Sequence, residues 1–568
     1  MNIECDILVV GSGAAGLTAA LTAAKAGLSV IVAEKAAVIG GTTALSEGMV
    51  WIPGSRQAQA LGVFDPPEAA LEYIQRAAGT AFEPIRSRAF VESAAEMLAF
   101  VEDSGGPSFT LSTASMDYHP DWPGATLGAR ALIPGIFDGR LLGSRFNELR
   151  RPLESTLILG GMTIGSGELA IFRQAHCQPM AALHAARVIA RHAWDRLNGW
   201  SRGTRIANGN GLVASLLYAC LVRGVAFWTQ TALTELRAIH SSGGTRVTGA
   251  ILDRADQLYE VKVTRGVVLA SGGFSGSATM RARFFPTGAA GDSHTRIVPE
   301  SVSGDTLRIA ETLGAKVIVN ASVASWAPAS RVPLGLSGAV EGFPHFMERQ
   351  KPGFIAINGS GFRFVNEATS YSQFVQAMLA DAGDKEPVCW LICDRPTLRR
   401  YGMGAAPPFP LGIGKYVRSG YLVEASDLVV LARRIGVDET TLKQTVATFN
   451  ANASRGTDPD FERGLSAVDR AYGDSTHPGH PNLAPINNAP YYAVRLRTGD
   501  IGSLAGLASD EHARVTDVDG RPISGLCVAG NDAASLFGGT YPAGGITIGP
   551  AMTFGWIASR TLADSTKS

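Results

Sequence analysis

The sequence lacks the charge excess that would direct it toward a charged partner. Lysine plus arginine number 50 and aspartate plus glutamate also number 50, so the formal net charge of the 568-residue chain is zero. Because nucleic acids attract proteins with an excess of cationic side chains, this balance disfavours a nucleic-acid partner. We therefore expect a small, uncharged substrate.

Cysteine is scarce and scattered along the chain. The six cysteines stand at positions 5, 177, 220, 389, 393 and 527. The one close pair, Cys389 and Cys393, has a spacing that fits neither a redox CxxC motif nor a zinc knuckle. The pattern predicts reduced thiols and no metal site.

Long apolar runs are missing as well. No stretch reaches the ~18 uninterrupted apolar residues of a membrane-spanning helix. The first residues, Met1 to Asp6, lack the basic segment and the small-residue cleavage site of a secretory signal. We expect a cytoplasmic protein, with any membrane contact confined to the periphery.

A dinucleotide-binding fingerprint is present at the N-terminus. An apolar run at 7–10, typical of a buried parallel strand, leads into a glycine-rich turn and an alanine-rich helix; a second strand ends at Glu34. The turn consists of Gly11, Ser12, Gly13, Ala14, Ala15 and Gly16. Glycines let a pyrophosphate approach the N–H groups of the helix start, and an acidic residue at this distance accepts from ribose hydroxyls. This predicts an α/β fold with a Rossmann-like, parallel-sheet domain.

Glu34 by itself does not distinguish FAD from NAD, but a second small-residue turn follows it. That turn comprises Gly40, Gly41, Thr42, Thr43, Ala44, Leu45 and Ser46. Together the two turns resemble the FAD-binding proteins of the fumarate reductase and succinate dehydrogenase flavoprotein superfamily. The resemblance implies non-covalent FAD. It also implies further cofactor contacts from Lys35, Gly48, Ala232, Gly272, Gly273, Asn366, Gly530, Asn531, Asp532, Gly545 and Ile546.

A glycine-rich loop near the C-terminus, residues 538–549, holds five glycines in twelve positions around Tyr541. Glycine lets the backbone pass close to a flat ligand because it has no Cβ. The mostly apolar run that follows, Ile546 to Trp556, predicts a buried helix whose first N–H groups face that ligand.

The chain divides by composition into two domains. Residues 1–283 and 498–568 carry the strand and turn signals of the nucleotide domain, including a helical stretch at 66–101 and buried strands at 266–274 and 525–532. Residues 284–497 have longer, proline-rich connections and predict an inserted α+β catalytic domain, with a hairpin of strands at 353–358 and 361–367.

Residues 141–205 form a basic insertion with nine arginines. One helical face there carries Leu183, Ala186, Ala190, Trp194 and Leu197, and another carries His184, Arg187, Arg191 and Asp195. A basic amphipathic helix of this kind can lie in a membrane interface. The alternative is an ordinary surface helix or an oligomer contact, because amphipathic helices normally turn their apolar face to a core.

The whole chain also resembles the 3-ketosteroid Δ1-dehydrogenases, FAD enzymes that introduce a C1–C2 double bond beside a ring ketone. The segments that carry the resemblance are residues 11–16, 40–46, Trp51-Ile52-Pro53, Asp117-Tyr118, 364–371 and 531–555. The resemblance implies that Tyr371 removes a proton from C2, assisted by Tyr118. Tyr541 O–H and Gly545 N–H would hold the C3 carbonyl oxygen, while flavin N5 takes the hydride from C1 and passes electrons to an acceptor such as a quinone.

These implied roles agree with elementary chemistry. A phenol and a backbone amide can form an oxyanion hole for an enolate, and a tyrosine base needs a neighbouring donor or a positive field to work near neutral pH. The dicarboxylate reductases of the superfamily carry a histidine and an arginine in the loop where this chain has Tyr541 and Gly545. A neutral, apolar ketone therefore fits better than an anion. None of the ten histidines is assigned a role, although His119 beside Tyr118 merits a test.

Two alternatives stay open. One is a 3-oxo-5α-steroid 4-dehydrogenase or a related enone reductase, although the run Tyr541 to Gly545 favours the Δ1 type. The other is a non-catalytic, membrane-attached flavin electron carrier, which would bind FAD without being reduced by any ketone.

Overall fold

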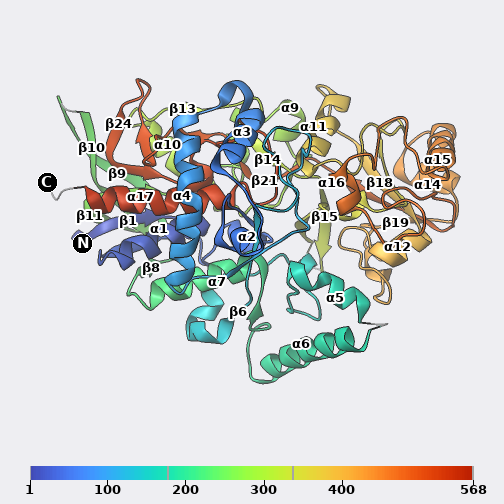
Figure 1. The fold of residues 1–568 in the computed structure, drawn as a ribbon, viewed down its shortest axis with the longest axis horizontal. Coiled ribbons are helices and arrows are strands. Elements are labelled where there is room, and N and C mark those ends of the chain that lie inside the picture. Colours follow the sequence, from blue (N-terminus) through green and yellow to red (C-terminus); the bar gives the residue numbers. More distant parts are fainter. Residues whose placement is uncertain (1, 176–177, 243, 336–337, 566–568) are drawn as a thin grey trace.

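The computed structural model describes residues 2–175, 178–242, 244–335 and 338–565. The molecule is elongated, with both termini and the N-terminal sheet at one end and residues from about 350 to 490 at the other (Figure 1). Helix α6 (Pro179–Leu197) projects from the lower side of the body.

The predicted parallel sheet is confirmed. Five parallel strands lie in the order β24-β11-β1-β2-β8. Their bounds are β1 (Asn2–Val10), β2 (Val30–Ala33), β8 (Ala226–Trp228), β11 (Gln257–Leu269) and β24 (Pro522–Val528). Strand β11 is longer than predicted, because its N-terminal half also pairs with β10 (Gly244–Arg254), which in turn pairs with β9 (Thr231–Ser241).

Three helices pack together beside this sheet. Helix α1 (Ala14–Lys25) contacts both α17 (Ile548–Asp564) and α7 (Asn208–Leu221). The approach of α17 is close, since a Cβ on Gly555 would lie 2.4 Å from the carbonyl oxygen of Ala15. Ser559 Oγ donates to Ala19 O at 2.7 Å. The C-terminal helix is therefore packed directly on the nucleotide-binding helix.

The stretch at 66–101, predicted as continuously helical, is divided into α3 (Pro67–Ala78), a 3-10 turn (Gly79–Ala81) and α4 (Pro84–Asp103). Gly79 ends α3 because it adopts φ +55°, and Pro84 then begins α4, where its missing N–H is not needed.

The far end of the molecule is built on an antiparallel sheet in the order β17-β18-β20-β19. The strands are β17 (Phe354–Asn358), β18 (Cys389–Asp394), β19 (Val423–Ala425) and β20 (Tyr491–Leu496). Helices α14 (Leu428–Ile435) and α15 (Glu439–Ala453) contribute apolar side chains to the same core. The mixed α+β character is as predicted; the domain boundaries at 283 and 498 stay predictions.

The predicted hairpin at 353–367 is half correct. Its first strand is β17, but the second is reduced to an isolated bridge between Ile357 and Arg363. Arg363 instead forms ion pairs with Glu367 and Asp458, both at 2.7 Å. The Glu367 carboxylate also accepts from Ala356 N of β17 at 3.0 Å, so side-chain contacts stand in place of the predicted backbone ladder.

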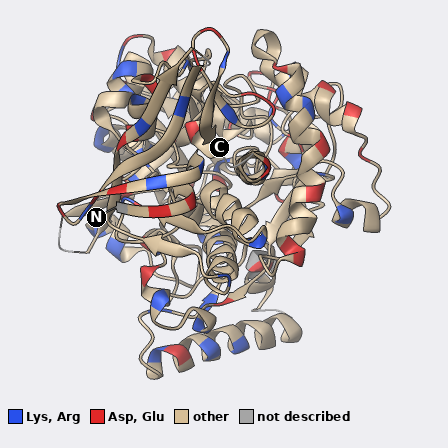
Figure 2. Ribbon diagram, turned by 90° about the vertical axis from the view of Figure 1, so that its left-hand side faces the viewer, with Lys and Arg blue, Asp and Glu red and all other residues tan. Residues whose placement is uncertain are grey.

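Charged side chains of both signs are interspersed on the ribbon (Figure 2), in line with the zero net charge. The five described cysteines are buried and unpaired; Cys177 lies outside the described residues. Within the described ranges, no helix has the length and apolarity required to span a bilayer.

Helix α6 turns its predicted apolar face to solvent. The side chains of Leu183, Trp194 and Leu197 are 43%, 62% and 82% exposed. On the opposite face, Asp195 is buried and accepts from Thr204 N at 2.7 Å, and Arg191 donates to Asp138 at 2.9 Å. The predicted apolar face therefore does not pack on the body, because the buried side of α6 is the one that carries Ala181, Ala185, Val188 and Asp195.

Candidate functional site

Three tyrosines distant in sequence meet between the two ends of the molecule. Tyr371 lies between Tyr118 and Tyr541, with ring centroids 5.8 Å and 5.1 Å away. Both of the other phenols raise the pKa of Tyr371, so they lie within interaction distance of its hydroxyl. Tyr371 and Tyr541 are buried, 9% and 6% exposed, and Tyr118 is half-buried. The three tyrosines among the four residues predicted to act on a ketone are therefore brought together.

Tyr371 is the first residue of α11 (Tyr371–Ala382). The preceding Ser370 caps this helix, its side chain accepting from Gln373 N at 3.3 Å. The N-terminal end of a helix carries a partial positive charge. A tyrosine at this position is therefore easier to ionise than a tyrosine in the middle of a helix.

The loop that carries Tyr118 is held on both sides. Tyr118 N donates to Pro542 O at 2.7 Å, which ties it to the glycine-rich loop. Its neighbour Asp117 is buried, where it accepts from Trp51 Nε1 at 2.8 Å and forms an ion pair with Arg130 at 3.1 Å. The phenol of Tyr118 is thus fixed by its backbone and by the residue before it.

Gly545 leaves no room for a side chain. Its backbone has φ +88°, and a Cβ would lie 2.7 Å from Trp51 N. Gly544 is similarly close, with a Cβ position 2.8 Å from Met49 Sδ and 3.6 Å from the Tyr118 hydroxyl. The glycines therefore let this loop pass between the segment 49–51 and the tyrosines.

Burial raises the pKa of Tyr118 and of Tyr371 well above that of a free phenol, and it raises the pKa of Tyr541 in the same direction. The phenols are therefore neutral at neutral pH unless a positive field or a bound group opposes the cost of desolvation.

The predicted nucleotide-binding turns, residues 11–16 and 40–48, have the features that a dinucleotide needs; we call them the nucleotide cradle. Gly11 has φ +107°, and a Cβ there would lie 2.2 Å from Ala270 O. Gly13, the N-cap residue of α1, makes no side-chain cap, and the first turn carries no acidic residue. Apart from the Ala14 N–H, which donates to Thr43 Oγ1, the amides there can face a pyrophosphate. The hydroxyl of Thr42 is buried and has no hydrogen-bond partner among the described residues. An unpartnered hydroxyl at this position fits a bound ligand.

Several predicted cofactor residues hold the cradle itself. The Glu34 carboxylate accepts from Ser12 Oγ at 2.5 Å and from Ser12 N at 3.1 Å. Thr43 Oγ1 accepts from Ala14 N at 3.1 Å, which joins the two small-residue turns. Gly48 has φ +72°, and a Cβ there would lie 2.6 Å from Gly209 N.

At the carboxyl end of the sheet, Asp532 joins two neighbouring strand ends. It accepts from Ser271 N at 2.5 Å and from Gly273 N at 2.8 Å. Gly530, Asn531 and Ile546 line a common cavity beside this point. These predicted residues thus lie at one edge of the sheet, where ligands of such folds bind.

Three predicted cofactor residues have other surroundings. Lys35 forms an ion pair with Asp305 at 2.6 Å on the surface. Asn366 donates to Asp469 at 2.9 Å and accepts from Ala368 N at 2.8 Å, so both ends of its amide are used within the 284–497 region. Ala232 pairs with Asp253 in the β9–β10 ladder, next to Thr231, whose N–H donates to Glu34 O at 2.9 Å.

Two residues near the tyrosines were not anticipated from sequence. Tyr472 packs edge-on against Tyr118, with centroids 6.2 Å apart. Glu47 influences the pKa values of Tyr118, Tyr472 and Tyr541, and no described cation forms an ion pair with it. The Glu47 side chain is accessible to solvent, but the surrounding protein still raises its pKa by desolvation. Glu47 could have been noticed in the sequence, because it is a single charged residue directly after the small-residue turn at 40–46. No sequence pattern marks Tyr472.

His119 stacks on Trp122 with ring centroids 3.8 Å apart. Burial lowers the pKa of His119 to about 4, so the imidazole is neutral at neutral pH. The ring is a packing element of the loop that carries Tyr118.

Comparison with known proteins connects this geometry to a family. A family model described as an FAD binding domain matches residues 6–548. The chain is 38% identical to a 4-oxocyclohex-2-ene-1-carboxylate 5-dehydrogenase of Sinomonas cyclohexanicum, over 99% of this chain and 94% of that one. It is 35% identical to a 3-oxosteroid 1-dehydrogenase of Mycobacterium tuberculosis, over 99% and 98%.

A solved structure agrees with these relatives. The 3-ketosteroid Δ1-dehydrogenase of Sterolibacterium denitrificans, in complex with 1,4-androstadiene-3,17-dione, is 36% identical and matches with a TM-score of 0.92, covering 99% of this chain and all of that one. The chain therefore belongs to the FAD binding domain family shared with the 3-oxosteroid 1-dehydrogenases, and its cofactor is FAD.

Proposed function

We propose that this protein desaturates a 3-ketosteroid at C1–C2, with Tyr371 as the base. The observation that carries the proposal is the convergence of three tyrosines, two of them buried, with a loop in which Gly545 admits no side chain. The 3-oxosteroid 1-dehydrogenases among its relatives support the same reaction.

Each residue has a distinct task in the proposed reaction. Tyr371 takes the proton from C2, and Tyr118 shares a hydrogen bond with it and assists its ionisation. The Tyr541 hydroxyl and the Gly545 N–H donate to the C3 oxygen, where negative charge develops as the proton leaves. Bound FAD supplies the acceptor for the hydride from C1. Residues 11–16 and 40–48 would hold the cofactor.

A smaller, anionic ketone is the second candidate substrate. Two relatives from Sinomonas cyclohexanicum, 38% and 35% identical, act on oxocyclohexene and oxocyclohexane carboxylates by their names. Glu47 argues against this class, because a carboxyl group in either protonation state offers no cation to a substrate carboxylate. The neutral ketone is therefore the better match.

One anaerobic experiment tests the reaction and the substrate together. The yellow protein is mixed with androst-4-ene-3,17-dione, with a 3-ketosteroid that is saturated at C4–C5, or with 4-oxocyclohexanecarboxylate. Flavin absorbance is followed, and the position of the new double bond is determined. We expect bleaching by the steroid and a C1–C2 product. A C4–C5 product from a saturated steroid would favour the 4-dehydrogenase alternative. No bleaching across a panel of ketosteroids would leave the electron-carrier alternative and overturn the proposal.

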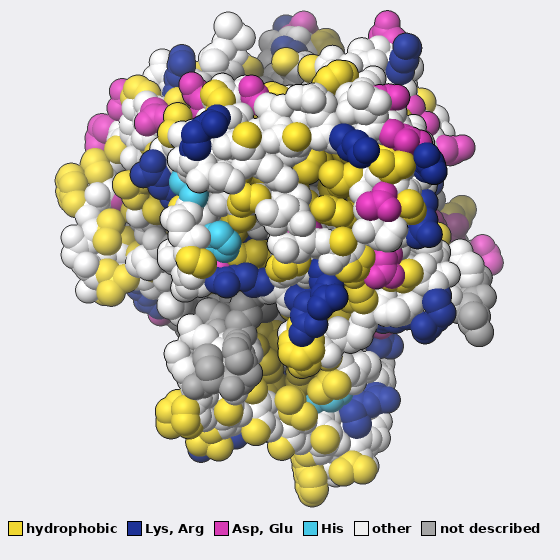
Figure 3. Space-filling model, turned by 90° about the vertical axis from the view of Figure 1, so that its right-hand side faces the viewer, with side chains coloured by type: hydrophobic (Ala, Val, Ile, Leu, Met, Phe, Trp, Pro, Cys, Tyr) yellow, Lys and Arg dark blue, Asp and Glu magenta, His cyan; other side chains and the backbone are white. Residues whose placement is uncertain are grey.

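We further infer that α6 contacts a membrane surface and that an acceptor such as a quinone would take up the electrons released by the reaction. The support is the solvent-facing stripe of α6, with exposed Trp194 and Leu197 beside exposed Arg187 and Arg196. Figure 3 shows hydrophobic side chains gathered on the lower projection of the molecule, where α6 lies. Apolar side chains next to cationic ones suit the anionic headgroup boundary of a bilayer. A steroid and a quinone both partition into that bilayer.

A further inference from the structure

Arg349 is a buried cation close to the proposed base. It lies in a 3-10 turn (Glu348–Gln350) and is fully buried. Its Nε donates to His345 O at 3.1 Å, and its Nη1 donates to the carbonyls of Glu367 and Thr369, the latter at 2.6 Å. Its Nη2 is buried without a hydrogen-bond partner in the described part of the chain.

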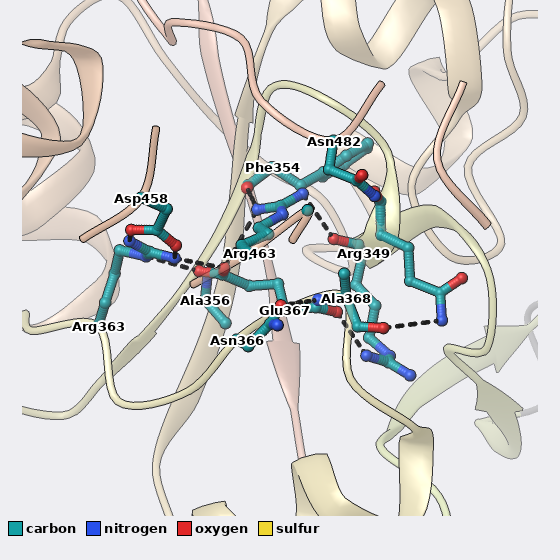
Figure 4. A network of polar contacts seen from close by, with 12 residues as sticks. Arg349, Phe354, Ala356, Arg363, Asn366, Glu367, Ala368, Asp458, Arg463 and Asn482 are labelled. Atoms are coloured by element: carbon teal, nitrogen blue, oxygen red, sulfur yellow. Dashed lines mark hydrogen bonds and ion pairs between the residues drawn. The ribbon is translucent and has the colours of Figure 1, made fainter. Parts of the chain in front are cut away.

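Two other arginines near Glu367, namely Arg363 and Arg463, have carboxylate counter-ions. Arg363 and Arg463 both form ion pairs with Glu367, and Arg363 also pairs with Asp458. Arg349 forms no ion pair with any described carboxylate. In Figure 4 its guanidinium lies apart from the side-chain carboxylates of Glu367 and Asp458. A desolvated charge without a direct counter-ion is unfavourable for folding by itself. It therefore calls for a functional explanation.

The contacts of Arg349 lead directly to Tyr371. The two carbonyls that it binds belong to residues 367 and 369, immediately before the start of α11. Its guanidinium lies over the ring of Phe374, 5.1 Å from the centroid, on the first turn of the same helix. It is also within electrostatic reach of the Tyr118 phenol.

The remaining ionisable groups around this point are mostly acidic or neutral. Glu47, Tyr472 and Tyr541 face Tyr118, and each of them disfavours a phenolate there. Glu348 is the main carboxylate acting on Arg349, but it is bound to His345 and to Gly404 N. Arg349 is thus a positive charge within electrostatic reach of Tyr118 that can oppose these groups.

We propose that Arg349 is a positioning residue that stabilises the phenolate form of the Tyr371–Tyr118 pair and fixes the start of α11. The inference rests on the proposed role of Tyr371 as base. An ionised phenol beside a fixed cation in a dry site is favoured over one without it. The charge therefore brings the base toward its working pH, a task that a purely structural arginine would not have.

The test compares Arg349→Gln with Arg349→Lys and Glu348→Gln. Anaerobic flavin reduction by androst-4-ene-3,17-dione is measured as a function of pH. We expect Arg349→Gln to raise the apparent pKa of the base by about one unit. At pH values below that pKa the variant should reduce flavin roughly tenfold more slowly than the wild type, and at high pH the two rates should become equal. Arg349→Lys should shift it less, and Glu348→Gln, which removes an opposing charge, should lower it.

A second readout does not depend on turnover. Tyrosine ionisation is followed by ultraviolet difference absorbance in each variant, with and without an added Tyr371→Phe change that isolates the signal of Tyr371. If the wild type reduced no ketone, the proposed function would fail while this titration still reported the field at Tyr371. A rate loss that is uniform with pH, or an unshifted titration in Arg349→Gln and Glu348→Gln, would overturn the inference.

Discussion

Gly545 and Trp51 are joined backbone to backbone. The Gly545 carbonyl accepts from Trp51 N at 3.2 Å, and a Cβ on Gly545 would approach that nitrogen to 2.7 Å. Trp51 is itself held by Asp117, the residue before Tyr118. One contact thus couples the loop that would bind the ketone oxygen to the loop that carries an assisting tyrosine.

Gly545→Ala is expected to remove ketone-dependent flavin reduction and to lower stability by about 3 kcal/mol, from left-handed backbone strain plus overpacking. Gly520→Ala is the matched control, because Gly520 also has positive φ but nothing within 4 Å of its Cβ position. The control should cost about 1 kcal/mol. Thermal unfolding measures both, and equal losses would refute the close-contact explanation.

Tyr371→Phe is expected to slow steroid-dependent flavin reduction by roughly 10²–10⁴-fold while FAD stays bound, since the base is lost but no cradle residue changes. Stopped-flow absorbance gives the rate, and the flavin-to-protein absorbance ratio gives occupancy. Tyr218→Phe, on α7, is the control and should react like the wild type. Near-normal reduction by Tyr371→Phe would remove this residue as the base.

Glu47→Gln tests why a neutral ketone is preferred. Reduction by 4-oxocyclohexanecarboxylate should rise by roughly tenfold, because like-charge repulsion is relieved. Reduction by the steroid should change by less than about threefold. Glu72→Gln, on the exposed side of α3, provides the control. An unchanged ratio of the two rates would show that Glu47 does not select the substrate.

The lowered pKa of His119 makes stability depend on pH. Burial lowers this pKa from 6.5 to about 4, so between these values the unfolded chain binds a proton that the folded protein does not. Stability from this group is therefore complete above pH 6.5 and is lost as pH falls toward 4. Denaturant unfolding of the wild type should show a decline on the order of 1–3 kcal/mol that is smaller in His119→Gln. Parallel curves for the two proteins would contradict this.

Replacing Trp194 and Leu197 by serine is expected to reduce co-sedimentation with anionic liposomes at least fivefold, because both side chains are largely exposed and would lose apolar contact with lipid. Arg191 is left unchanged, since it anchors α6 to Asp138. Leu258→Ser, an equally exposed position on β11, controls for loss of surface apolarity. Equal binding by all three proteins would exclude α6 as a membrane contact.

Local sequence determined the nucleotide-binding part of the fold. The run 7–16 defines a strand, a glycine turn and a helix start within ten residues, so short-range preferences suffice to place β1 and α1. The close approach of Gly11 to Ala270 then explains why the glycine is needed. The final strand and the loop at 538–549 were recognisable for the same reason.

Long-range contacts decided what local patterns could not. The second strand of the hairpin predicted at 353–367 is reduced to one isolated bridge, and its Arg363 pairs instead with Asp458, 95 residues away. The larger apolar side chains of α6 face outward, because Ala181, Ala185 and Val188 pack against the body while Asp195 binds Thr204 and Arg191 binds Asp138. These partners lie outside the helix, so its periodicity does not reveal them.

The sequence by itself determined the cofactor cradle and the identity of three tyrosines, since both are carried by short motifs. Only the tertiary structure shows that Tyr371 begins a helix and that Glu47 lies within electrostatic reach of Tyr541. It also shows that one guanidinium nitrogen of buried Arg349 has no hydrogen-bond partner among the described residues. These relations depend on burial and on charges brought together from remote segments. Electrostatic free energy depends on the distances between charges and on the exclusion of solvent, and the order of residues in the chain gives neither quantity.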